Sequence, residues 1–109
     1  MSSVPEKDWK LFRKLQADLT ARVCDSVFVK VEELAKSRKN KEHQSYLDLY
    51  ELIQEQDQLI GEYFNNPTRN NALLKIVALQ SNNILTKEEF SLFSEETQVR
   101  VNEIIELRR

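Results

Sequence analysis

The scarcity of residues that break helices most constrains what this 109-residue chain can fold into. The sequence holds one glycine, Gly61, and two prolines, Pro5 and Pro67. Sheets with tight hairpins and loops that cradle phosphate both need glycine, because glycine reaches positive φ at no steric cost. Few turns are therefore available, and the sequence predicts a small number of long helices in an all-α fold.

Length and composition predict one domain that spans residues 1–109. A chain of this size buries roughly two thirds of its unfolded surface around one core. Hydrophobic residues make up 40% and charged residues 31%, and no apolar run approaches the ~20 residues that cross a bilayer. The first residues lack the apolar stretch of a secretory signal, and a single cysteine cannot form an internal disulfide. We expect a cytoplasmic protein with no membrane contact.

The first periodic stretch predicts one helix from about Ser3 to about Ser37. Ser3 and Glu6 have the spacing of a capping box. Residues 27–31 alternate like a strand, but no glycine, proline or partner strand bounds them, so helix is the better interpretation. Apolar residues recur at intervals of three, four or seven and form one stripe: Trp9, Phe12, Leu19, Val23, Val27, Val31 and Leu34.

The next segment predicts a loop and then the clearest amphipathic helix. The loop covers residues 36–41, with Asn40 as a possible N-cap. Gly61 lies in the last turns of the helix, where it costs about 1 kcal/mol against alanine. Either another backbone packs closely there or the glycine is simply tolerated. The apolar face carries Tyr46, Leu49, Tyr50, Ile53, Ile60 and Phe64, and the opposite face carries Asp48, Glu51, Glu55 and Glu62.

The third quarter of the chain predicts a buried central helix. Residues 65–67, Asn-Asn-Pro, predict that the preceding helix ends and that the next helix starts there. Residues 72–79 are apolar almost all round, and residues 82–83, Asn-Asn, can end the helix. The expected core is Phe12, Leu19, Ile53, Ile60, Phe64, Leu73, Ile76, Val77, Phe90 and Ile104.

The best-specified boundary lies near residue 86. Thr86 and Glu89 have capping-box spacing, with Leu85 and Phe90 placed for a hydrophobic staple. Ser94, followed by two glutamates, can restart the helix with a bend. The overall prediction is a four- to five-helix antiparallel bundle-like domain with a long N-terminal helix.

The sequence offers little catalytic chemistry. Cys24 lies at the edge of an apolar stripe and is interpreted as a small buried hydrophobe, and His43 as an exposed residue near a helix start. These two residues cannot supply four zinc ligands, and neither a Glu-x-x-His pair for di-iron nor a glycine-rich phosphate loop is present. We expect no catalytic residue, metal or cofactor, and no enzymatic activity.

Charge is divided unevenly along the chain. Residues 1–41 hold ten Lys/Arg and six Asp/Glu, a net +4, while residues 42–109 hold six and twelve, a net −6. The two halves either neutralise each other, within the fold or across a dimer, or form a surface for a charged partner. The candidate basic patch is Lys36, Arg38, Lys39 and Lys41, and the candidate acidic ridge is Asp48, Glu51, Glu55 and Glu62.

The length of the first helix favours self-association. A helix of about 35 residues is ~50 Å long, more than a globule of radius ~13 Å covers. Leu11, Val29 and Leu47 point outward on the helical wheels and are the candidate interface residues. We expect a homodimer that presents a helical surface to a protein partner as an adaptor or regulator. The alternative is a nucleic-acid-associated regulator that uses the 36–41 loop, with a small enzyme third.

Overall fold

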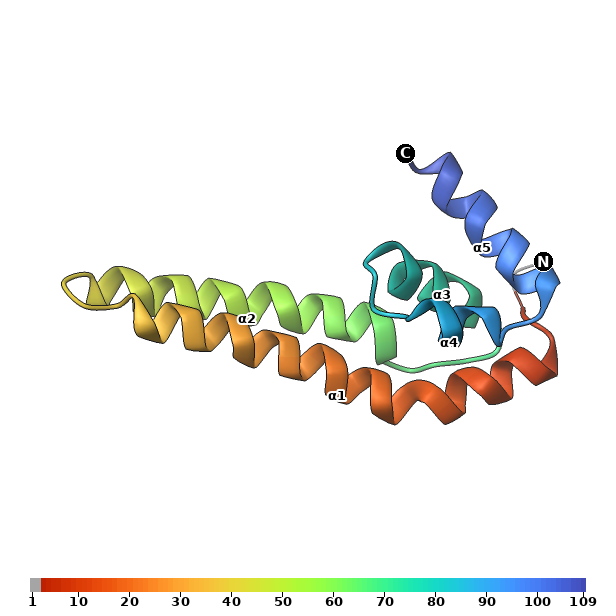
Figure 1. The fold of residues 1–109 in the computed structure, drawn as a ribbon, viewed down its shortest axis with the longest axis horizontal. Helices are drawn as coiled ribbons and strands as arrows, with labels where there is room; N and C mark the ends of the chain where they lie inside the picture. Colours follow the sequence, from red (N-terminus) through yellow and green to blue (C-terminus); the bar gives the residue numbers. More distant parts are fainter. Residues whose placement is uncertain (1–2) are drawn as a thin grey trace.

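The computed structural model describes residues 3–109, which form five helices and no strand. The helices are α1 (Glu6–Lys36), α2 (Glu42–Phe64), α3 (Ala72–Ser81), α4 (Lys87–Ser91) and α5 (Glu95–Leu107). Figure 1 shows α1 and α2 as a long antiparallel hairpin, with α3, α4 and α5 gathered at its open end. The predicted all-α class and the long first helix are confirmed.

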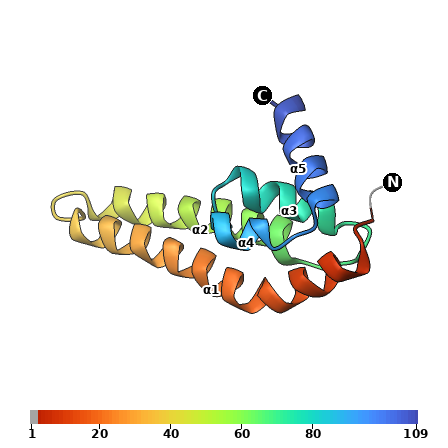
Figure 2. The same ribbon diagram turned by 45° about the vertical axis from the view of Figure 1, so that its right-hand side comes forward.

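The molecule is elongated because the hairpin extends well past the three shorter helices (Figure 2). Its principal extents are 53 × 28 × 25 Å and its radius of gyration is 16.5 Å, whereas a compact domain of this length has a radius of about 13 Å. We call the extended part of the hairpin, residues 24–57, the arm, and the remainder the base. The two parts differ in how their side chains are covered.

The hydrophobic core lies entirely in the base, and α3 passes through it. Its buried members are Val4, Phe12, Leu19, Val23, Tyr63, Phe64, Ala72, Leu73, Ile76, Val77, Leu79, Leu85, Phe90, Phe93 and Val101. Seven of the ten expected core residues are among them, and Ile60 and Ile104 pack against the cluster half-buried. The prediction that Ile53 belongs to the core is wrong. Its side chain is 47% exposed, because α1 and α2 alone form the arm at that level.

The start of α1 differs from the prediction. Pro5 occupies the cap position without a side-chain hydrogen bond, so the Ser3–Glu6 capping box is wrong. The N-terminal segment is instead held by base residues, since Arg69 Nε donates to the carbonyl of Val4 at 2.7 Å and Arg100 Nη1 donates to that of Ser3 at 3.2 Å. These bonds leave Val4 buried in the core.

Two connections also differ in detail. Lys41, not Asn40, occupies the cap position of α2, and Asn40 takes a positive φ of 70° in the turn. The third helix begins at Ala72 rather than directly after Pro67. The intervening residues form a polar turn, in which Asn71 Oδ1 accepts a hydrogen bond from the backbone N–H of Thr68 at 2.8 Å.

A buried carboxylate joins the two ends of the chain. Asp8, in the first turn of α1, is fully buried. Its Oδ1 accepts a hydrogen bond from the Ser94 backbone N–H at 2.8 Å, and its Oδ2 accepts from the Ser94 hydroxyl at 2.6 Å. The Thr97 hydroxyl also donates to Oδ2, at 2.5 Å. Asp8 therefore fixes α1 against the N-terminus of α5, where a negative charge is favourable.

Replacing this carboxylate should destabilise the whole base. Asp8→Ala removes the acceptor of the buried Thr97 hydroxyl and of the half-buried Ser94 donors, which should lower the free energy of unfolding by about 2–4 kcal/mol. The corresponding fall in Tm is at least about 10 °C. Thermal and urea unfolding, followed by circular dichroism, measure both. Glu32→Ala, an exposed carboxylate on the same helix, is the control, and equal losses in the two variants would contradict the prediction.

The predicted capping box at α4 is present and carries an ion pair. The Thr86 hydroxyl accepts from the Glu89 backbone N–H at 3.0 Å, and Glu89 Oε1 accepts from the Thr86 N–H at 2.9 Å. Arg22 of α1 binds both Glu89 oxygens, at 2.7 and 2.9 Å. Its Nη1 also donates to the carbonyl of Ile84 at 2.7 Å. The hydrogen bonds from Arg22, helped by Thr86 and opposed by burial, lower the pKa of Glu89 to about 2.

This pair should contribute a pH-dependent part of the stability. The pKa of Glu89 is 4.5 when unfolded and about 2 when folded, so its contribution is complete above about pH 5 and is lost as the pH falls toward 2. Arg22 is 39% exposed, so solvent screening reduces the contribution to about 1–2 kcal/mol. Glu89→Gln should lower the free energy of unfolding by this amount at pH 7 and by almost nothing at pH 2. Urea unfolding at the two pH values measures both. Glu88→Gln should change little at either pH.

Gly61 is tolerated rather than required by close packing. A Cβ built there would meet only the side chain of Asn65, with the amide nitrogen at 3.0 Å. Asn65 is exposed and can move. Gly61→Ala should therefore raise the free energy of unfolding by about 0.5–1 kcal/mol through helix propensity. A lower free energy of unfolding in urea would mean that the Asn65 side chain cannot move away from the added methyl group.

Candidate functional site

The arm leaves most of its side chains uncovered. Among residues 24–57, all of which the structure describes, only Val27 and Ser45 are buried. Two packed helices cover each other along a single seam, so apolar residues beside the seam face outward. Figure 1 shows that α3, α4 and α5 lie at the other end of the hairpin. The arm is therefore the part of the molecule with apolar surface to bury.

One face of the arm carries two apolar hollows in line, which together we call the arm groove. Its residues recur at spacings of three or four on each helix, so they share one side of the hairpin. They form two hollows, of about 210 Å³ toward the base and about 230 Å³ toward the tip. The groove comprises Cys24, Phe28, Val31 and Ala35 from α1 and Tyr46, Leu49 and Ile53 from α2. Tyr50, one turn after Tyr46, is exposed beside it.

Large side chains in and beside the groove are unusually exposed. Phe28 is 65% exposed, Tyr46 63%, Tyr50 59% and Ile53 47%. Isolated surface apolar residues are common, but four on one face form a contiguous patch of the kind that marks an interaction site. Aromatic side chains are also enriched at protein interfaces, where they bury large areas at low entropic cost.

The two ends of the groove carry opposite charge. The sequence-predicted basic patch lies at the tip of the arm, where Lys36, Arg38, Lys39 and Lys41 are all exposed. Arg38 and Glu42 line the tip end of the groove, and Asp57 lines its base end. Asp25, one residue beyond Cys24 on α1, is also exposed there. Within residues 36–42 the four exposed cations outnumber the one carboxylate, so the tip of the arm is positive, while the groove lining holds Arg38 with Glu42 at the tip end and Asp57 at the base end.

The predicted interface residues do not coincide with this groove. Leu11 does not point outward, since it is half-buried and packs against the core. Val29 and Leu47 are exposed, by 48% and 44%, but neither lines the groove. Val29 lies 200° around α1 from the buried Val27 at 100° per residue, and so faces away from α2. The groove itself was missed because its residues have the spacing of an ordinary core face.

The predicted acidic ridge lies on the far side of α2 from the groove. Glu51, Glu55 and Glu62 are exposed, and Asp48 is half-buried. Asp48 Oδ1 accepts a hydrogen bond from the side-chain amide of Gln44 at 2.8 Å, a pair one helical turn apart. This face has the composition and hydration of the solvent side of an amphipathic helix.

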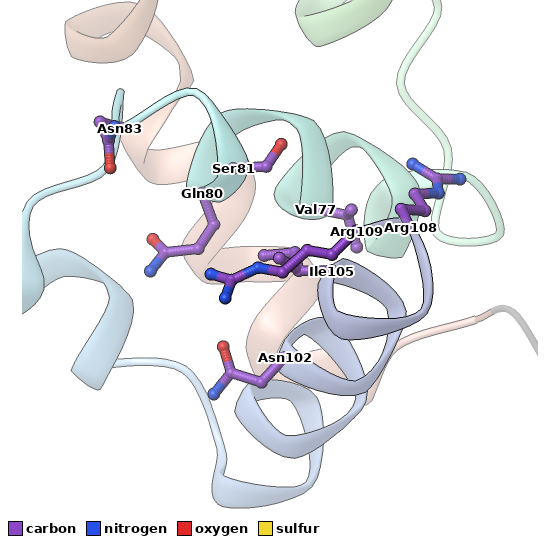
Figure 3. Close-up of a pocket in the computed structure, with 8 residues that line it drawn as sticks. All are labelled: Val77, Gln80, Ser81, Asn83, Asn102, Ile105, Arg108 and Arg109. Carbon is purple, nitrogen blue, oxygen red and sulfur yellow. The ribbon is translucent and has the colours of Figure 1, made fainter.

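A second concavity lies between α3 and α5 in the base. It has a volume of about 520 Å³ and is lined by Val77, Gln80, Ser81, Asn83, Asn102, Ile105, Arg108 and Arg109. Figure 3 shows Arg109 extending between Gln80 and Asn102, while Arg108 points the other way. None of the lining side chains is a carboxylate, histidine or cysteine, so the cleft holds no base beside its one hydroxyl. Its polar walls are readily hydrated.

The remaining chemically interesting residues are separated. His43 is exposed at the start of α2, and Cys24 is half-buried in the arm groove. Lys75 is buried, where its Nζ donates to the carbonyl of Glu62 at 2.9 Å and burial lowers its pKa. It thereby places a cation at the C-terminal end of α2. Across residues 3–109, no three His, Cys, Asp or Glu side chains gather closely enough to hold a metal ion.

A scan against protein-family models and searches of curated proteins and of solved structures give no match to this chain. Within the described residues, no helix has both the length and the apolarity that crossing a membrane requires. The arm groove is a stronger candidate than the polar cleft. Apolar surface gains about 25 cal/mol for each Å² removed from water, whereas the polar cleft has no comparable reason to be covered.

Proposed function

We propose that this chain is a non-enzymatic interaction protein, an adaptor or regulator, whose arm groove binds the apolar face of a helical protein partner. The observation that carries the proposal is the exposure of Phe28, Tyr46, Tyr50 and Ile53 on one face of a two-helix arm. A helix laid into such a groove presents anchors at intervals of three, four and seven residues. The groove offers matching hollows at two levels along its length.

The total exposed area supports the same proposal. The chain exposes 7562 Å², whereas a compact monomer of 12.9 kDa exposes about 6,300 Å². The excess of roughly 1,200 Å² exceeds the ~800 Å² that one partner buries in a standard interface. Such an excess of exposed area is expected of a protein that buries surface on binding. The side chains of the arm are mostly uncovered and contribute to it.

Site-specific photo-crosslinking in cells that produce the protein tests the proposal. Benzoylphenylalanine at position 50, beside the groove, should give a discrete adduct with a partner protein. The same probe at position 55, on the opposite face of α2, should not. Adding Ile53→Glu should reduce the position-50 adduct at least about tenfold, because a charge would have to be buried in the apolar groove.

The matched control for that substitution is Val29→Glu. Val29 and Ile53 have nearly the same exposure, 48% and 47%, but Val29 faces away from the groove. Its variant should keep the adduct. Equal crosslinking at positions 50 and 55, or an adduct insensitive to Ile53→Glu, would overturn the proposed function. The mass of the adduct identifies the partner.

A further inference from the structure

We infer that the occupant of the arm groove is a second copy of this chain, docked antiparallel so that the two arms form a four-helix bundle. The inference rests on the proposed function, since it requires the groove to be a binding surface. Three features carry it: the area of the groove, the spacing of its hollows and the charges at its two ends.

The arm supplies half of a bundle. From Glu42 to Asp57 the groove is about 22 Å long, and two adjacent helices are about 20 Å wide. This gives a footprint of roughly 450 Å² per copy, or about 900 Å² for two, before the relief of the side chains is counted. Specific interfaces begin near 1,000–1,200 Å² of accessible area. The flat footprint of two arms therefore lies just below this range, which is the size expected of a weak dimer.

The hollows and the protruding side chains are arranged symmetrically. Val31 on α1 and Leu49 on α2 lie near the middle of the groove, where they line the base-side edge of the tip hollow. A two-fold axis through this midpoint places Phe28 of each copy over the tip-side hollow of the other, beside Ala35. It likewise places Tyr46 over the base-side hollow, beside Ile53. The same patch thus serves on both copies, as a two-fold interface requires.

Charge selects the antiparallel orientation. Arg38 lies at the tip end of the groove and Asp57 at the base end. The axis that pairs position 28 with position 35 brings Arg38 of each copy opposite Asp25 of the other. It sets the basic tip against a base-end carboxylate, while Glu42 comes to lie opposite Asp57. Parallel docking would align tip with tip and Asp57 with Asp57, where like charges repel.

Sedimentation equilibrium on the purified full chain, at 5–200 µM in ~0.1 M salt, tests whether two copies associate. The expected mass at the upper concentrations is twice the 12.9 kDa of one chain. Ile53→Glu should raise the dissociation constant at least about tenfold with unchanged helical circular dichroism. Val29→Glu should leave the dissociation constant within about twofold. A monomer across the whole range, or a dimer that only Val29→Glu disrupts, would overturn the inference.

Cysteine crosslinking tests the orientation, in a Cys24→Ser background. A two-fold axis at the midpoint brings position 46 of one copy opposite position 53 of the other. A mixture of Tyr46→Cys and Ile53→Cys chains should therefore form a disulfide-linked dimer, while each variant alone should crosslink weakly. A mixture that crosslinks no more than either variant alone would contradict antiparallel docking. Arg38→Asp and Asp25→Arg should each weaken the dimer several-fold, and the double variant should restore it.

The two proposals fail in different ways. If the chain stays monomeric while the position-50 probe crosslinks a different protein, the second-copy inference is wrong and the proposed function stands. If the chain stays monomeric and the probe gives no groove-dependent adduct, both are wrong. An adduct with the mass of two chains, together with the sedimentation result, supports both.

Discussion

The length of α1 is the constraint on which the rest of the structure depends. Its 31 residues extend about 46 Å, and α2 runs back along it, but α3, α4 and α5 together hold 28 residues, enough to cover one end of the pair. The core consequently ends near Val23, and beyond it the same apolar stripe continues with α2 as its only cover. One continuous helix is thus half core scaffold and half exposed arm.

Polar contacts between distant segments hold the base together. Asp8 joins α1 to the start of α5, Arg22 joins α1 to the cap of α4, and Lys75 joins α3 to the end of α2. Each satisfies a helix end or a charge that would otherwise be costly to bury. The arm has no equivalent links to the short helices among the described contacts. The helices of the base are therefore held to one another by polar contacts, and the arm projects from them.

This division explains why the arm groove, and not the cleft in the base, is the functional candidate. Gln80, Asn102 and Arg109 line the cleft with polar groups that can hydrogen-bond to water, so leaving it open carries little cost. Phe28, Tyr46 and Tyr50 on the arm expose ring surface that gains free energy when it is covered. The basic tip, first considered as a nucleic-acid contact, also has a complementary counterpart at the base end of the groove.

The sequence by itself determined the helices, because the periodicity of apolar residues and the Thr86–Glu89 capping box are local signals that act within one or two turns. Tertiary structure decided what each face meets. Ile53 and Ile76 have the same helical spacing, yet one faces solvent and the other is buried, because a core and an interface leave the same periodic pattern. The partners of Asp8 lie 86 and 89 residues away. Only the folded chain brings them together.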